Sequence, residues 1–317
     1  MISQETRLIL ALTHLRGIGR KTIAEALRMN PSAPPQLEKW RLPERLERAV
    51  SSRLLFEEAM EKAEQQILHA QRHGGRIISI VDNDYPFLLK KIPDYPVLLY
   101  IHGNLRSSNY PRVAIIGTRQ PTATGQEVAR RIANYYAQAG WSIVSGLALG
   151  IDKVAHEAAL DVNGHTVAIL AHGLHMVAPS SHKRLSKRIL EAGGALISEY
   201  PYEVEPSSYR FVDRDRLQAG VSSGVILVQT GEKGGSLHTS RFALEYGRIL
   251  AFPIPGSKEK YHEKELGILR LATSSLADIR TFLQVRGELK GEQIFPLQSR
   301  EDYPLLERAL KDWDCSR

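Results

Sequence analysis

The chain has 317 residues, 43% of them hydrophobic, which suffices for one large domain or two smaller ones with a packed core. It carries a single cysteine, Cys315, which excludes an internal disulfide framework and a zinc site built from several cysteines. A signal-peptide layout and an apolar stretch long enough for a bilayer are both missing, so we expect a cytoplasmic protein without a membrane partner. The formal charge of +7 favours polyanionic partners without identifying one.

Residues 1–72 are predicted to form a small all-α domain. Apolar residues recur at helical spacing in RLILALTHL (7–15) and in LLFEEAMEKAEQQILHA (54–70), and the proline-rich NPSAPP (30–35) connects the two. The stretch LRGIGRKTIAEAL (15–27) looks like a helix-hairpin-helix (SAM-like) element, because its glycines permit a tight turn that offers backbone N–H groups to a phosphate. A helical-bundle turn without a ligand is the alternative, and the sequence leaves both open.

Residues 73–285 are predicted to form a Rossmann-like α/β domain. Short apolar runs alternate there with helical stretches, which implies βαβ units and a doubly wound, mostly parallel sheet covered on both faces. In such folds ligands bind beyond the carboxyl ends of the strands. Thr124 and Glu127 are predicted to form a capping box, and Gly140 to end the same helix. The predicted strands are 113–117, 141–146, 166–170, 195–199, 224–229 and 249–254.

The remaining residues, 286–317, are predicted to be a short polar tail. The tail has room for one helix, PLLERALKDW (304–313), and not for a winged-helix domain.

Three strand-end loops rich in small residues are expected to meet at one edge of the sheet: GTRQPTAT (117–124), SGLALGID (145–152) and TGEKGGSLHTSR (230–241). Small residues let backbone N–H groups approach an anion, and a helix N-terminus adds its dipole. Any one loop alone could be a simple turn, but three together favour an anion pocket. The candidate phosphate-binding residues in these loops are Gly117, Thr118, Arg119, Ser145, Gly146, Gly235, Ser236, Thr239 and Arg241.

Common nucleotide and metal motifs do not account for this pocket. Neither G-x-G-x-x-G nor the P-loop pattern follows the first predicted strand, so a usual NAD or ATP site is poorly supported and no cofactor is expected. The histidines near the loops do not have zinc-motif spacing, and a G-x-S-x-G nucleophile elbow is missing, so we expect core or loop roles for His156, His172, His175 and His238.

Two further segments concentrate positive charge. The helix HKRLSKRIL (182–190) carries Lys183, Arg184, Lys187 and Arg188 as two i,i+4 pairs, which either bind a polyanion or form a solvated face. The stretch FVDRDRLQAG (211–220) offers Arg214 and Arg216, although Asp213 and Asp215 could neutralise them and Asp215 could instead cap a helix.

The order of these motifs resembles the DprA/Smf family of DNA-processing proteins over roughly residues 80–257. The matching segments include VAIIGTRQPT, SGLALGIDKVAH, ILAHGLHMVAPSSHKRL, ALISEYP and GGSLHTSRFALEYGRILAFPIPG. The resemblance implies binding of single-stranded DNA, homodimers formed through the Rossmann-like domain, loading of a RecA-type recombinase, and no catalysed reaction. It implies that Arg119 and Lys183 contact the DNA backbone, that Ser145, Gly146, Gly235 and Ser236 form the pocket, and that Arg214 and Arg216 occupy the family's R-N-R segment.

Departures from the family pattern keep other functions open. Asp213 and Asp215 flank Arg214 and should weaken a polyanion site unless they pair internally. Together with the short tail, this suits a divergent paralogue, and one hypothesis places it in a phage-defence locus beside a cognate toxin. An enzyme is a second alternative, because nucleotide-hydrolysing relatives carry the motif G-G-x-G-T-x-x-E. The comparable stretch here is GGSLHTSR, in which Arg241 stands where the catalytic Glu should be. Glu245 could be a displaced substitute for that Glu. A pocket that senses a nucleotide without catalysis is a third alternative.

Overall fold

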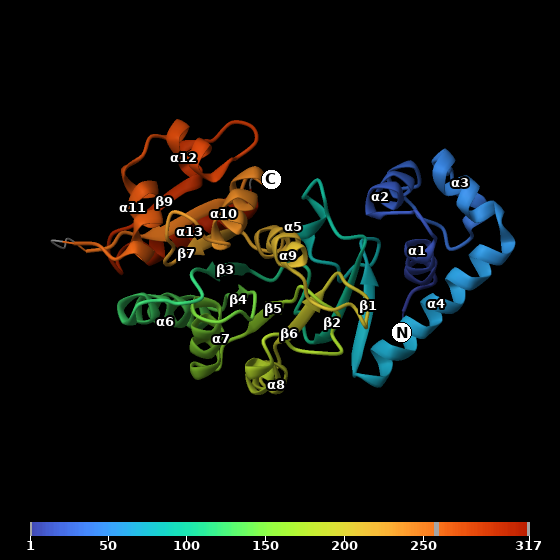
Figure 1. Ribbon diagram of the computed structural model, residues 1–317, viewed down its shortest axis with the longest axis horizontal. Coiled ribbons are helices and arrows are strands. Elements are labelled where there is room, and N and C mark those ends of the chain that lie inside the picture. The colour runs from blue at the N-terminus through green and yellow to red at the C-terminus, as the bar shows by residue number, and fades with distance from the viewer. Residues whose placement is uncertain (1, 257–259, 316–317) are drawn as a thin grey trace.

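The computed structural model describes residues 2–256 and 260–315, and its strands form a single sheet of nine within that range (Figure 1). The order across the sheet is β1-β2-β6-β5-β4-β3-β7-β8-β9. The six predicted strands all form, and three more join them at the two edges. The strands are β1 Gly75–Ser79, β2 Leu98–Gly103, β3 Arg112–Ile116, β4 Ser142–Ser145, β5 Thr166–Ile169, β6 Ala195–Ser198, β7 Gly224–Leu227, β8 Ile249–Pro253 and β9 Ile294–Leu297.

Strand direction confirms the Rossmann-like prediction. All pairs from β6 across to β9 are parallel, whereas β2 pairs antiparallel with both β1 and β6. The order β5-β4-β3-β7-β8-β9 is that of a doubly wound sheet, in which the chain crosses from β3 outward in one direction and returns to extend the sheet from β7 in the other. The crevice between the carboxyl ends of β3 and β7 is therefore the topological switch point, where such folds bind ligands.

Helices cover both faces of the parallel strands, as the apolar strand composition predicted. α6 (Ala123–Gln138), α7 (Ile151–Asp161) and α13 (Asp302–Cys315) share one core with alternate residues of β3, β7 and β8. α9 (Ser208–Gly220), α10 (Ser236–Glu245) and α12 (Leu276–Leu283) share a second core with the opposite residues of these strands. The remaining helices of this region are α5 Phe87–Lys90, α8 Lys183–Glu191 and α11 Leu266–Thr273.

The residues after 285 complete the sheet, which the sequence did not predict. β9 pairs in parallel with β8, and α13 buries Leu306 and Leu310 against the core that contains α6. A four-residue strand with one buried side chain carries too weak an alternation to be recognised from sequence. The predicted helix in this segment does form.

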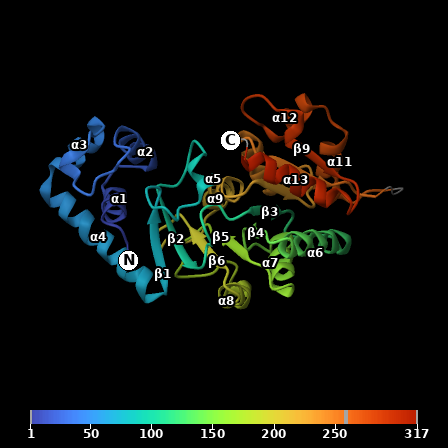
Figure 2. The same cartoon turned by 180° about the vertical axis from the view of Figure 1, so that it is seen from behind.

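The N-terminal helices pack against the β1 edge of the sheet, and Figures 1 and 2 show them at the end opposite α11 and α12. They are α1 Gln4–His14, α2 Arg20–Met29, α3 Glu44–Ser51 and α4 Arg53–Arg72. Gly17, in the hairpin between α1 and α2, has φ +78°, a conformation that favours glycine. None of the helices in the described ranges combines the length and apolarity that crossing a membrane requires.

The cap of α6 corrects one local prediction. Thr122, not Thr124, is the N-cap, and its hydroxyl accepts the N–H of Gly125 at 3.0 Å. Glu127 instead lies 3.7 Å from the half-buried Arg131 in an i,i+4 ion pair. The N-cap of α6 thus lies two residues before the predicted one.

Candidate phosphate-binding site

A cavity of about 600 Å³ opens at the switch point between β3 and β7. Its walls are the loop after β3, the loop between β7 and α10, and one side of α9. The first turn of α10 also lines it, so backbone N–H groups and a helix dipole meet there. The polar and glycine residues that line the cavity are Gly117, Thr118, Arg119, Gln120, Asp152, Ser208, Arg214, Asp215, Gln218, Thr230, Gly231, Lys233, Gly234, Gly235, Ser236, His238 and Thr239.

The loop after β3 is held in place by close backbone packing. A Cβ added to Gly117 would lie 2.7 Å from the side chain of Ile151 and 2.9 Å from the carbonyl oxygen of Gln229. The Gln229 amide accepts the N–H of Thr122 and donates to its hydroxyl, both at 2.9 Å. Only glycine fits at residue 117, and Gln229 ties the loop to β7. Sequence reasoning missed Gln229, because nothing local marks a glutamine that bridges two loops.

Arg119 presents its charge at the mouth of the cavity. It is exposed, and its guanidinium carbon lies 5.3 Å from the ring centroid of Phe211 on α9. A guanidinium over an aromatic face leaves its N–H groups free for an anion, and the pair also offers a flat surface on which a base can stack.

Arg214 supplies the second positive charge, from inside the wall. Its side chain is 4% exposed, and its Nε lies 3.5 Å from Oδ1 of Asp215. Its Nη1 makes no hydrogen bond to any residue in the described ranges. Nη1 itself is packed against Gly146, behind the lining, so Arg214 acts on the cavity through the charge of its guanidinium and through the part of the side chain that lines the cavity.

Two carboxyl groups accompany Arg214. Asp152 accepts the N–H groups of Gly146 and Ala148 at 3.0 and 3.3 Å, and burial raises its pKa. Burial also raises the pKa of Asp215 to about 7, with Arg214 opposing the rise. Asp215 is therefore only partly charged at neutral pH. It lies within α9 and does not cap a helix, which corrects that alternative.

The structure brings only some of the predicted site residues together at the cavity. Those that the structure brings together around the cavity are Gly117, Thr118, Arg119, Arg214, Gly235, Ser236 and Thr239. Gly146 lies just behind the wall, in contact with Arg214. Ser145 is a correction: its buried hydroxyl donates to the carbonyl oxygen of Ile115 at 2.7 Å, so it braces β4 against β3.

The basic helix α8 lies outside the cavity. Lys183, Arg184 and Lys187 are exposed, and Lys187 is 3.5 Å from Glu191. His182, which precedes this helix, lies 2.8 Å through Nδ1 from the carbonyl oxygen of Leu147, so α8 begins beside the loop after β4.

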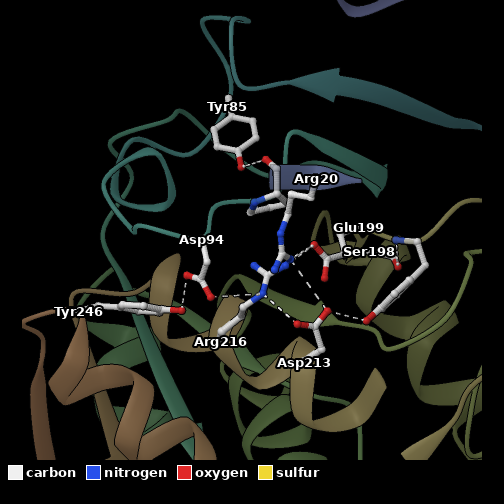
Figure 3. A network of polar contacts seen from close by, with 10 residues as sticks. Arg20, Tyr85, Asp94, Ser198, Glu199, Asp213, Arg216 and Tyr246 are labelled. Carbon is white, nitrogen blue, oxygen red and sulfur yellow. Dashed lines mark hydrogen bonds and ion pairs between the residues drawn. The ribbon is translucent and has the colours of Figure 1, made fainter. Parts of the chain in front are cut away.

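Arg216 is a further correction, because it faces away from the cavity into a buried ion-pair network (Figure 3). It pairs with Glu199, lies 3.3 Å from Asp213, and lies 3.8 Å from Asp94. Arg20 of α2 joins the network at 3.3 Å from Glu199. Arg214 and Arg216 point to different sides of α9, so Arg214 lies at the cavity and Arg216 lies in the ion-pair network.

Glu245 and Arg241, the two positions that bear on the enzyme alternative, lie outside the cavity lining. Glu245, at the end of α10, accepts the N–H of Arg286 at 3.0 Å and does not line the cavity. Arg241 is also outside the lining, with its guanidinium carbon 4.8 Å from the ring centroid of Phe242. His156 and His172 are buried, and burial lowers the pKa of both. His238 does line the cavity, and burial lowers its pKa as well.

Comparison with known proteins agrees with this architecture. Residues 76–281 match the family model of DNA recombination-mediator protein A. The chain is 43% identical over 193 residues to Protein Smf of Escherichia coli, covering 61% of this chain and 51% of that protein. It is 39% identical over 194 residues to the DNA processing protein DprA of Bacillus subtilis, covering 61% and 65%. The chain thus spans about half to two thirds of these relatives.

Two solved structures resemble the fold. DprA from Streptococcus pneumoniae superposes with a TM-score of 0.70 at 26% identity, covering 96% of this chain and 98% of that one. DprA from Helicobacter pylori, whose structure describes a single-stranded DNA binding mode of that protein, superposes with a TM-score of 0.56 at 28% identity, covering 66% and 94%. Because this family model covers more than half of the sequence, this chain belongs to the DNA recombination-mediator protein A family.

Proposed function

We propose that this protein binds single-stranded DNA through backbone phosphates at the cavity between β3 and β7. The observation that carries the proposal is that two cationic side chains line one cavity: Arg119, exposed over Phe211, and Arg214, buried in the wall. Glycines at residues 117, 234 and 235 allow close approach of the backbone. Membership of a family that includes a structurally characterised single-strand binder supports the same conclusion.

The binding is expected to be largely blind to sequence at this cavity. Its polar groups are guanidinium, ammonium, hydroxyl and backbone donors, which suit phosphate oxygens. The Phe211 and Arg119 pair offers a stacking surface, and every base has a face that can stack. Lys183, beyond the loop after β4, would extend the path of the strand along the same edge of the sheet.

The two aspartates that depart from the family pattern do not prevent this function. Asp213 is directed to Arg216 and to the Tyr200 hydroxyl, which donates to it at 3.0 Å, so its charge is neutralised away from the cavity. Asp215 lines the cavity, but its raised pKa reduces its charge near neutral pH. Both carboxyls are compatible with a phosphate beside Arg119 and Arg214.

In this proposal the protein is a non-catalytic mediator of DNA recombination in the cytoplasm. It acts as a homodimer through its Rossmann-like domain and passes the bound strand to a RecA-type recombinase. The family resemblance supports these partners.

Fluorescence anisotropy tests the DNA proposal. A labelled 30-nucleotide single strand and its duplex are titrated with the protein over a salt series. We expect preferential binding of the single strand, with a slope of log K against log salt of about −0.7 per phosphate contacted. Arg119→Ala with Lys183→Ala should weaken binding at least tenfold. Arg48→Ala with Arg53→Ala, which removes the same charge from exposed positions on α3 and α4, is the matched control. Failure to bind the single strand at low salt would overturn the proposal.

A further inference from the structure

A second cavity, of about 220 Å³, lies between the N-terminal helices and the edge of the sheet. Residues of α1, the hairpin and α2 form one side, and residues of β2 and the segments beside it form the other. It is distinct from the switch-point cavity, with which it shares no residue. The apolar part of its wall is Ile18, Ile23, Pro96, Val97, Leu98 and Pro201.

Three polar atoms of the side chains that line this cavity lack a hydrogen-bond partner in the described part of the chain. The Tyr100 hydroxyl, His14 Nε2 and Glu199 Oε1 are buried and make no hydrogen bond within residues 2–256 and 260–315. Tyr100 is 1% exposed and the Glu199 side chain 9% exposed. Because buried polar groups are almost always satisfied, three unsatisfied atoms around one cavity indicate a polar occupant.

The size and walls of the cavity restrict that occupant. A volume of 220 Å³ is several times the ~30 Å³ that one water takes and below the range of about 300–1,000 Å³ for drug-sized ligands. Aliphatic and proline side chains give flat apolar walls, and the unsatisfied atoms give a polar edge. A single planar heterocycle with N–H groups on its edge fits both the apolar walls and the polar edge.

The surroundings connect this cavity to DNA. Arg20 and Glu199 also line a neighbouring groove of about 550 Å³, whose rim carries Lys21, Arg45 and Tyr209. Tyr209 is 72% exposed, and it stands on the first turn of α9. Two residues further along α9, Phe211 lines the switch-point cavity. The first turn of α9 is thus a ridge between the phosphate site and the hairpin groove.

We propose that a bound single strand crosses this ridge and inserts one base into the cavity between the hairpin and the sheet. The inference rests on the proposed DNA binding and adds a base-reading site to it. The base stacks between the apolar walls, donates an amino hydrogen to Glu199 Oε1, and forms its other edge contacts with the Tyr100 hydroxyl and His14. Lys21 and Arg45 hold the adjoining phosphates.

Glu199 determines which bases fit. Burial raises the pKa of Glu199 to about 7, so the side chain is mainly a carboxylate only above neutral pH. In that state Oε1 accepts from the exocyclic amino group that adenine, cytosine and guanine carry and thymine does not. Burial lowers the pKa of His14, which keeps this ring neutral and free to accept or donate through Nε2. Amino-bearing bases are therefore preferred over thymine.

Homopolymers provide the first test. Affinities of labelled (dC)20, (dA)20 and (dT)20 are measured by anisotropy for the full chain, with (dT)20 as the phosphate-only baseline. We expect (dC)20 or (dA)20 to bind more tightly than (dT)20. Tyr100→Phe, which removes only the hydroxyl, should reduce that preference roughly two- to tenfold and leave (dT)20 unchanged. Tyr136→Phe, at a buried tyrosine of α6 whose hydroxyl bonds the Tyr303 carbonyl, is the control.

Free nucleosides separate this inference from the proposed function. Calorimetric titration with deoxycytidine, deoxyadenosine and thymidine is carried out on the wild type and on Arg119→Ala, which weakens the phosphate site alone. Binding of an amino-bearing nucleoside that persists in Arg119→Ala and weakens in Tyr100→Phe supports the base site even if DNA binding fails. Equal homopolymer affinities that Tyr100→Phe does not change, with no nucleoside bound, would overturn the base site and leave phosphate binding intact.

Discussion

Gly146 lies directly against the guanidinium of Arg214, so closely that an added Cβ would overlap Nη1. The glycine sits at the end of β4 and the arginine on α9, 68 residues later in the chain. The contact sets the position of the buried charge in the wall of the phosphate site. Gly146 thus acts on the site without lining the cavity.

Gly146→Ala tests this positioning. The methyl group should displace the Arg214 guanidinium, because an added Cβ would lie 1.6 Å from Nη1 and this end of a flexible side chain borders the open cavity. We expect single-stranded DNA affinity to fall about tenfold, as it should for Arg214→Ala. Gly291→Ala, at an exposed position where an added Cβ would meet only Leu276 Cδ1 at 3.9 Å, is the control for a general glycine effect on folding. Anisotropy measures both, and unchanged affinity in Gly146→Ala would contradict the assignment of Arg214.

The raised pKa of Asp215 predicts a pH dependence of DNA binding. The carboxyl is neutral below its pKa of about 7 and becomes an anion beside the phosphate site above it. Affinity for (dT)20 should therefore fall by roughly fivefold, or ~1 kcal/mol, between pH 6 and pH 8 at constant ionic strength. Asp215→Asn should depend less on pH than the wild type, because it removes this carboxyl and burial lowers the pKa of His238 in the same lining. A wild-type affinity that is flat with pH would be the contrary result.

The same carboxyl should also influence stability. Its folded pKa exceeds the ordinary value of 3.8, so the native state binds more protons than the unfolded state between about pH 4 and pH 7. The contribution of Asp215 to the free energy of unfolding is greatest below pH 4, declines as pH rises to 7, and is constant above. Asp215→Asn should therefore become more stabilising relative to wild type as pH rises through this window. Urea denaturation at pH 5 and pH 8 measures it, and an effect independent of pH would contradict the raised pKa.

Arg216 should matter for folding rather than for phosphate contact. Arg216→Met leaves Glu199 and Asp213 buried together without their main cationic partner, which costs about 3–5 kcal/mol in comparable buried networks. Denaturant unfolding should detect the loss, while Arg188→Met, at an exposed position on α8, should stay within about 0.5 kcal/mol of wild type. A stable Arg216→Met variant that loses DNA binding would instead mean that Arg216 contacts the phosphate.

The C-terminal segment offers a paired test of the fold. Leu306 is fully buried in the core beneath α13, whereas Leu305, its neighbour, is 52% exposed. Leu306→Ala should lower the free energy of unfolding by about 2–5 kcal/mol, and Leu305→Ala should change it by less than about 0.5 kcal/mol. Equal effects of the two substitutions would mean that α13 does not complete the sheet.

Local pattern alone determined much of this architecture. The runs 113–117, 224–229 and 249–254 are apolar enough to be buried strands, and their alternation with amphipathic helices dictates a parallel sheet. The chain order of loops and strands also placed Gly117, Arg119 and Ser236 at a common edge, because parallel strands end on the same side. Period and composition are properties of neighbouring residues, so a single sequence carries them.

Tertiary structure decided what each charged side chain does. Arg214 and Arg216 are two residues apart on α9, yet the helical rotation directs one to the phosphate site and the other to Glu199 and the N-terminal helices. The same holds for Ser145, whose hydroxyl is turned to β3, and for Tyr100, His14 and Glu199, which are brought to one cavity from three separate segments. Burial and long-range pairing depend on residues far apart in the chain, and only the folded arrangement specifies them.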